Sequence, residues 1–138
     1  MAAVYGRVAD EALSAGVSGR ASVLVVDDEA MIGSVICRLL KGHDVVAVTG
    51  ARAALERIGR GERFDLILCD LEMPEMDGVA FHEALVGIAP ELAERVVFVS
   101  GRVAENDEVV LKTSGVRMRV AKPFDVEQLR AIVKARVR

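Results

Sequence analysis

Residues 22–28 read SVLVVDD: a short apolar run, rich in β-branched side chains, that ends in two aspartates. Four consecutive apolar residues in such a run predict a strand that is buried on both faces. Downstream, the apolar residues from Ile32 to Leu40 recur every three or four positions, which predicts a helix with one face toward the core. Gly42 marks the expected end of that helix. The stretch therefore predicts a buried strand followed by an amphipathic helix.

The same alternation of an apolar run and an amphipathic segment continues toward the C-terminus. At 116–120, apolar residues alternate with arginines, which places this strand near an edge of the sheet. Short connections between alternating strands and helices predict an α/β fold with parallel strands, right-handed crossovers and helices on both faces. Further strands are predicted at 44–48, 66–69, 96–99 and 116–120, and further helices at 51–58, 78–88, 104–113 and 126–137.

The sequence signals for two of the predicted helices differ in strength. Asp77 is a suitable N-cap for the helix at 78–88, which would turn Phe81, Leu85 and Ile88 toward the core. The helix at 104–113 has a poor apolar stripe, and a helix with few apolar anchors is locally less stable. We therefore expect its position to be the easiest to bias.

Length and composition limit the classes of protein to which the chain can belong. Its 138 residues, 52% of them hydrophobic, fit one domain that needs no disulfide or metal to fold. A net charge of −3 gives the chain as a whole no electrostatic footprint for a nucleic acid, which calls for a basic face, and the absence of a long apolar stretch predicts no membrane insertion. We predict that residues 21–138 form the domain and that residues 1–20, which have no signal-peptide pattern, are an N-terminal leader or linker.

The cysteines and histidines carry no recognisable motif. Cys37 and Cys69 lack CxxC spacing and lie in apolar surroundings, so we interpret them as buried free thiols in a reduced, cytoplasmic setting. His43 lies in a predicted turn and His82 lies beside Phe81, and we expect structural or surface roles for both.

Polar residues follow the predicted strands at the points where those strands end. Each has an ordinary explanation on its own, as a helix cap, a turn or a loop residue. Together they have compatible chemistry, and the carboxyl ends of parallel strands meet at one edge of the sheet, where ligands bind. The residues concerned are Asp27, Asp28, Asp70, Ser100 and Lys122.

These side chains suit a phosphoryl group. Three neighbouring carboxylates repel one another and need a counter-charge, and Mg²⁺ fits an open site of oxygen ligands. A lysine and a serine hydroxyl would neutralise and hydrogen-bond the phosphoryl oxygens. Because the chain has neither a GxxxxGK[ST] nor a GxGxxG motif, we do not expect a bound nucleotide. A carboxylate remains as the nucleophile, which points to an aspartyl phosphate.

Four motifs together resemble the receiver domain of bacterial two-component response regulators. They are VVDDE at 25–29, LCDLEMPEMDG at 68–78, VSG at 99–101 and AKPF at 121–124. The resemblance spans about residues 22–137 with every motif in order. It implies a flavodoxin-like (βα)5 three-layer sandwich whose five parallel strands have the order 2-1-3-4-5.

The resemblance also implies roles for single residues. Asp70 would be the phosphoacceptor. Mg²⁺ would be held by Asp28, Asp70 and the backbone carbonyl of Glu72, with Asp27 acting mainly through water. Ser100 and Lys122 would contact the phosphoryl oxygens, in the family's pattern with a cis bond between Lys122 and Pro123.

Further expectations concern the neighbours of these residues. Gly101 belongs with Lys122 to the expected phosphate-binding end of the site, where it leaves access to Asp70 unshielded. The carboxylate of Glu72 is positioned to orient or exclude the hydrolytic water.

One position departs from the family pattern. In receivers the hydroxyl at Ser100 moves toward the phosphate, and an aromatic side chain three residues before the lysine turns inward. Here that position is Arg119, and burying an unpaired guanidinium is costly. Two interpretations stay open: a solvated charge on an edge strand, or a partner for an acid such as Glu105 or Asp107, or for another protein.

The expected partners follow from the resemblance. The phosphoryl group would come from a phosphohistidine of a sensor histidine kinase or a histidine phosphotransfer protein, and a downstream protein would bind the face formed by 104–138. The chain would then be no stand-alone enzyme, although it would catalyse its own phosphorylation and dephosphorylation, alone or as part of a hybrid histidine kinase.

Two other functions remain as alternatives. One is a receiver-fold interaction module that works without phosphate, against which the complete residue set argues. The other is a Mg²⁺-dependent phosphatase similar to the haloacid dehalogenase class, whose D-x-D-x-[TV] motif is not matched by DDEA at 27–30.

Overall fold

The structure is a computed structural model that describes residues 19–100, 119–121 and 125–137. Only the backbone is described for Ser100 and for residues 119–121. The predicted helix at 104–113 lies outside the described residues, as do Gly101, Lys122 and the Lys122–Pro123 bond. The boundary at residue 20 stays a prediction because residues 1–18 are also outside them.

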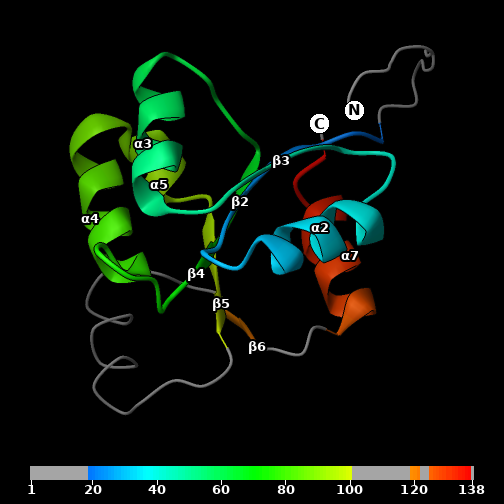
Figure 1. The fold of residues 1–138 in the computed structure, drawn as a ribbon. Helices are drawn as coiled ribbons and strands as arrows, with labels where there is room; N and C mark the ends of the chain where they lie inside the picture. Colours follow the sequence, from blue (N-terminus) through cyan, green and yellow to red (C-terminus); the bar gives the residue numbers. More distant parts are fainter. Residues whose placement is uncertain (1–18, 101–118, 122–124, 138) are drawn as a thin grey trace.

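A parallel sheet runs through the centre of the molecule (Figure 1). Within the described residues it has five strands in the order β3-β2-β4-β5-β6, so the predicted order 2-1-3-4-5 is confirmed. The strand at 116–120 was expected near an edge, and β6 is an edge strand. The strands are β2 (Ser22–Val26), β3 (Asp44–Val48), β4 (Leu66–Asp70), β5 (Val96–Ser100) and β6 (Arg119–Ala121).

Helices cover both faces of this sheet, which confirms the predicted three-layer sandwich. One face is covered by α2 and α7, and the other by α3, α4 and α5 (Figure 1). Asp125 is the N-cap of α7, because its side chain accepts hydrogen bonds from the backbone N–H groups of Glu127 and Gln128. The helices are α2 (Ala30–Leu39), α3 (Ala51–Gly59), α4 (Gly78–Ile88), α5 (Pro90–Ala93) and α7 (Val126–Lys134).

Alternating residues of the strands fill two separate cores. In β2, Leu24 and Val26 pack on the α3–α4 side, whereas Val23 and Val25 pack against α2 and α7. A strand with one polar face would fill only one of the two cores, because successive side chains point to opposite faces of a sheet. The apolar run of β2 is therefore explained by its burial on both faces.

The end of α4 differs from the sequence prediction. Phe81 and Leu85 are fully buried, but Ile88, which was expected to face the core, is 55% exposed, so this prediction was wrong. The helix ends at Ile88, and the chain turns at Ala89 into the short helix α5, which was not predicted. Ala89 and Leu92 of this turn fill the core instead.

The lone cysteines and His82 have structural surroundings. Both cysteines are free thiols, but only Cys69 is fully buried, whereas Cys37 is half-buried. His82 is buried, with its Nε2 atom 3.2 Å from the backbone oxygen of Ala93 and its ring tilted against that of Phe98. These contacts agree with a structural role for His82.

Candidate functional site

Two carboxylates lie close together because they come at the ends of neighbouring strands. β2 and β4 are paired in parallel, and Val26 is opposite Cys69 in their register. The residue that follows each member of this pair is an aspartate: Asp27 comes directly after β2, and Asp70 is the last residue of β4. The register of the sheet therefore places Asp27 and Asp70 side by side at its carboxyl edge.

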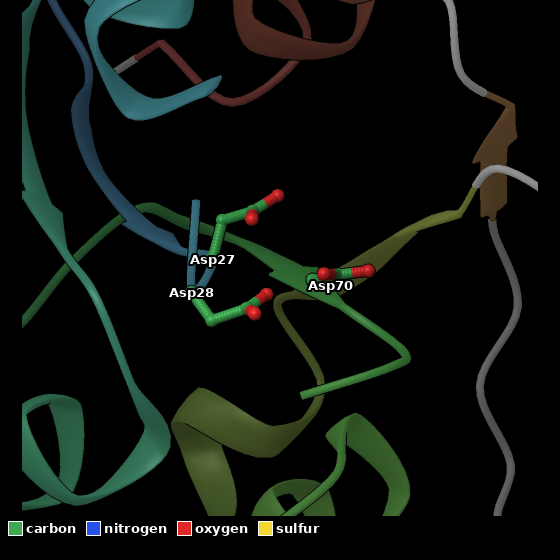
Figure 2. A group of neighbouring side chains, drawn as sticks. All are labelled: Asp27, Asp28 and Asp70. Carbon is green, nitrogen blue, oxygen red and sulfur yellow. The ribbon is translucent and has the colours of Figure 1, made fainter. Parts of the chain in front are cut away.

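Asp28 completes a group of three carboxylates. One carboxylate oxygen from each of Asp27, Asp28 and Asp70 lies within 4.8 Å of the other two. Figure 2 shows all three side chains turned toward a common space beyond the ends of β2 and β4. The sequence predicted that these residues would meet at this edge, and the structure places them there.

Local hydrogen bonds set the positions of the carboxylates. Asp27 Oδ1 accepts the backbone N–H of Glu29 at 2.9 Å, which fixes the turn from β2 into α2. The backbone N–H of Asp27 donates to the oxygen of Val48 at 3.2 Å and so ties this turn to the end of β3. Asp70 Oδ1 accepts the backbone N–H of Glu72 at 3.3 Å. The site is thus held by backbone groups of three neighbouring segments.

The group is partly shielded from solvent. Asp27 and Asp70 are buried, at 3% and 6% exposure, whereas Asp28 is exposed. The buried thiol of Cys69 immediately precedes Asp70 in the chain, and its pKa is raised well above the usual value, first by burial and then by the charges of Asp70, Asp27 and Asp77. Cys69 is therefore a protonated thiol at neutral pH, not a nucleophile.

The chemistry of the donor set fits a hard divalent cation. All three side chains offer only oxygen, and three negative charges within this distance need a counter-charge. Mg²⁺ takes oxygen ligands and keeps several waters, so it needs an opening to solvent, which the exposed Asp28 supplies. The arrangement can therefore hold Mg²⁺ and leave the Asp70 carboxylate beside it.

The other predicted site residues are placed only through the backbone. Asp70 is opposite Val99 in the β4–β5 register, so Ser100 follows at the same edge of the sheet as the carboxylates. Ser100 is in turn opposite Ala121, the last residue of β6, and Lys122 comes next in the chain. Arg119 begins β6 opposite Phe98. Lys122 and Gly101 themselves lie outside the described residues.

Gly78 is a positioning residue to which the sequence analysis assigned no role. It begins α4, and a Cβ atom added there would lie 2.5 Å from the backbone oxygen of Asp70 and 2.9 Å from a ring carbon of Phe98. Its N–H donates to the oxygen of Leu71 at 2.9 Å. The loop after Asp70 can close onto α4 only because this residue has no side chain. The DG pair at 77–78 was visible in the sequence, but the contact with Phe98 was not.

A search among protein families finds one match over most of the chain. The family model described as "Response regulator receiver domain" matches residues 23–134. Among curated proteins, the transcriptional regulatory protein ZraR of Escherichia coli K12 is 32% identical over 114 residues, which are 81% of this chain and 25% of that protein. The sensor histidine kinase CheAY of Helicobacter pylori is 29% identical over 119 residues, 84% of this chain and 15% of that protein.

Solved structures have the same fold. A response regulator receiver protein from Pseudomonas putida is 28% identical, with a TM-score of 0.77 over 86% of this chain and 99% of that one. The chemotaxis protein CheY4 of Vibrio cholerae is 26% identical, with a TM-score of 0.76 over the same shares. In the ranges that the structure describes, no helix is long and apolar enough to cross a membrane. The chain spans a quarter or less of the two curated relatives named above.

Proposed function

Because the chain belongs to the response regulator receiver domain family, we propose that it accepts a phosphoryl group on Asp70 in a two-component phosphorelay. The observation that supports this most strongly is the meeting of Asp27, Asp28 and Asp70 within 4.8 Å at the carboxyl edge of the sheet. Asp70 is one of the two buried members and ends the central strand β4, next to the strand end that carries Ser100. A carboxylate so placed is a suitable nucleophile for phosphoryl transfer.

The proposed reaction has two steps. An oxygen of the Asp70 carboxylate attacks the phosphorus of a phosphohistidine in line, the N–P bond breaks, and the imidazole keeps the electron pair. Later, water attacks the acyl phosphate, inorganic phosphate leaves, and the carboxylate is restored. The chain is then no stand-alone enzyme but catalyses both steps on itself.

Receiver domains generally bind Mg²⁺ at an acidic pocket, and here Asp28, Asp70 and the backbone carbonyl of Glu72 are the proposed ligands, with Asp27 acting through water. The bound ion would supply positive charge to the phosphoryl oxygens. The chain's own contribution is to hold the Asp70 carboxylate in place, with the Glu72 N–H donating to Oδ1 at 3.3 Å. Burial of Asp27 and Asp70 limits the access of water to the same group.

The remaining roles continue the same proposal. Ser100 and Lys122 contact the phosphoryl oxygens, and Gly101 leaves the approach to Asp70 open. The movement of Ser100 then changes the surface formed by 104–138, which binds a downstream protein. Arg119 stands at the usual aromatic position of the switch, so we propose that the switch does not depend on a buried ring there.

The partners are proposed by class only. A sensor histidine kinase or a histidine phosphotransfer protein supplies the phosphoryl group, in the cytoplasm, and nucleic acid is not a proposed ligand of this chain. Several curated relatives are transcriptional regulators of which this chain spans only a part. What the whole of such a protein does is therefore not carried over to this chain.

Incubation with acetyl phosphate tests the proposal directly. In the presence of Mg²⁺, the chain should gain the mass of one phosphoryl group, measured by intact-mass spectrometry. With EDTA in place of Mg²⁺ the gain should fall by at least about tenfold, because the metal contributes several kcal/mol of charge stabilisation and each 1.36 kcal/mol is tenfold in rate. No gain under either condition would favour an interaction module that works without phosphate. Continuous phosphate release with no phosphorylated protein detectable at any time would favour the phosphatase alternative.

Glu72 provides a second test through the lifetime of the acyl phosphate. Its side chain, two residues beyond Asp70, is exposed and lines a cavity of about 500 Å³ together with Pro74, Asp77 and Val79. A carboxylate there orients or excludes the hydrolytic water, so Glu72→Ala should change the half-life by at least about twofold. Phosphate release is the measurement. Glu83→Ala, an exposed carboxylate on α4, is the control and should leave the half-life unchanged. Equal half-lives for both variants would show that the Glu72 carboxylate has no part in hydrolysis of the acyl phosphate.

A further inference from the structure

A pocket lined by basic side chains lies at the other end of α2 from the carboxylates. Its volume is about 880 Å³, and it lies between the C-terminal ends of α2 and α7 and the turn before β3. The ten residues of α2 span about 15 Å, which separates this pocket from the site that follows β2. Its basic side chains are Arg38, Lys41, Arg130 and Lys134, and we call it the basic pocket.

The positive charges of the basic pocket are poorly compensated. None of the residues described as lining it is acidic. Arg130 is 3.6 Å from Glu127 and donates its Nε–H to the backbone oxygen of Leu39 at 3.4 Å. Among the described residues, Arg38, Lys41 and Lys134 form no ion pair. Like charges gathered in this way repel one another, and an anion bound between them would relieve that repulsion.

Helix dipoles account for only part of this arrangement. Arg38 is in the last turn of α2 and Lys134 is in the last turn of α7, where cations complement the negative helix end. Lys41 lies beyond the end of α2, and Arg130 is in the middle of α7. Two of the four cations therefore have no such explanation.

The rest of the lining is apolar or neutral. Leu39 and Val137 are half-buried and also line the pocket. His43 is also half-buried, and burial, reinforced by the charge of Arg20, lowers its pKa from the usual value. Its Nδ1 accepts the N–H of Ala21 at 3.0 Å, so the proton of the neutral ring is on Nε2. The basic pocket thus offers both cations and apolar side chains.

We propose that the basic pocket docks an acidic segment of a partner protein, one in which carboxylates flank an apolar side chain. Charge complementarity to the four cations and apolar contact with Leu39 and Val137 are the two recognition elements. The basic pocket and the three carboxylates lie at opposite ends of α2, so neither recognition element belongs to the candidate site. The proposal does not depend on the phosphoacceptor function and would survive its failure.

A titration followed by NMR tests this proposal on the whole chain. The probe is the peptide acetyl-Glu-Glu-Leu-Glu-Glu-amide, and the matched neutral peptide carries glutamine for each glutamate. The acidic peptide should shift the backbone amide signals of Lys41, His43 and Lys134. The pocket variant Arg38→Glu with Lys134→Glu should weaken binding by at least about tenfold, and the milder pair with glutamine at both positions should have a smaller effect.

A second double variant controls for net charge. Arg52→Glu with Arg60→Glu makes the same change in charge on exposed side chains of α3 and the residue after it, on the opposite face of the sheet. It should weaken binding less than about twofold. The proposal would be overturned if both double variants weakened binding of the acidic peptide equally. It would also be overturned if the neutral peptide bound as tightly as the acidic one, or if millimolar acidic peptide shifted no amide signals. Inorganic pyrophosphate is the remaining probe, and if it shifts the same signals at lower concentration than the peptide, the pocket takes small anions instead.

Discussion

Replacement of Asp70 by asparagine should abolish phosphorylation by acetyl phosphate while leaving the fold intact. The side chain keeps its shape, and Asn Oδ1 can still accept the N–H of Glu72, which lies 3.3 Å from Asp70 Oδ1. What is lost is the negative charge and nucleophilicity of the carboxylate oxygen. Removing one of three neighbouring negative charges also relieves repulsion, so no large loss of stability is expected. Intact-mass spectrometry should detect no phosphorylated Asp70→Asn protein, and the thermal unfolding curve should show one cooperative transition.

A matched substitution makes this result specific. Asp44→Asn removes a carboxylate from the first residue of β3, at the edge of the sheet away from the candidate site. This side chain pairs with Arg20 near the surface, so only a small change in stability is expected. The Asp44→Asn protein should be phosphorylated as the unmodified chain is. Full phosphorylation of the Asp70→Asn protein would mean that another residue is the acceptor.

The second large effect is expected at Gly78, where alanine should both destabilise the fold and slow phosphorylation. The added Cβ would lie 2.5 Å from the Asp70 backbone oxygen, 2.9 Å from Phe98 and 3.0 Å from the Leu71 Cα atom. Two of these neighbours are backbone atoms, which cannot rotate away as the end of a flexible side chain can. Overpacking of this kind costs about 1–3 kcal/mol or more, equivalent to a drop of ~4 °C in Tm for each kcal/mol. Relief of the clash would displace Asp70 and Leu71.

The same helix supplies the control for Gly78. Gly87 also lies in α4, and a Cβ added there would meet nothing within 4 Å. Gly87→Ala should therefore raise the stability by about 0.5–1 kcal/mol, because alanine loses less backbone entropy in a helix. Thermal unfolding and the acetyl phosphate rate are the two measurements. A Gly78→Ala protein that unfolds at the same temperature as the unmodified chain would show that the close approach is not needed.

The strands could be predicted well because burial on both faces leaves a continuous apolar run. β2 and β3 have the bounds that were expected, and β4 and β5 extend one residue further than predicted. The carboxylates at the ends of β2 and β4 could be predicted as neighbours because all strands of a parallel sheet end at one edge. Strand order, in contrast, came from the family resemblance, since periodicity does not say which strands pair.

The features that were missed depend on contacts between distant segments. Helix α5 has four residues, too few to show a helical period, and it takes the core position that had been assigned to Ile88. The need for glycine at position 78 arises from Phe98, which belongs to another strand. The basic pocket joins Arg38 and Lys41 to Arg130 and Lys134, about ninety residues apart in the chain. No local pattern brings such residues together before the fold is known.

The position of the phosphoryl group shows directly whether Asp70 is the phosphoacceptor. After reaction with acetyl phosphate and Mg²⁺, borohydride reduces an aspartyl phosphate to homoserine, and peptide mass spectrometry then locates the altered residue. We expect homoserine at position 70 and at no other aspartate, Asp27 and Asp28 included. Homoserine at either of those positions, or an unaltered Asp70 in protein that has gained the phosphoryl mass, would contradict this expectation.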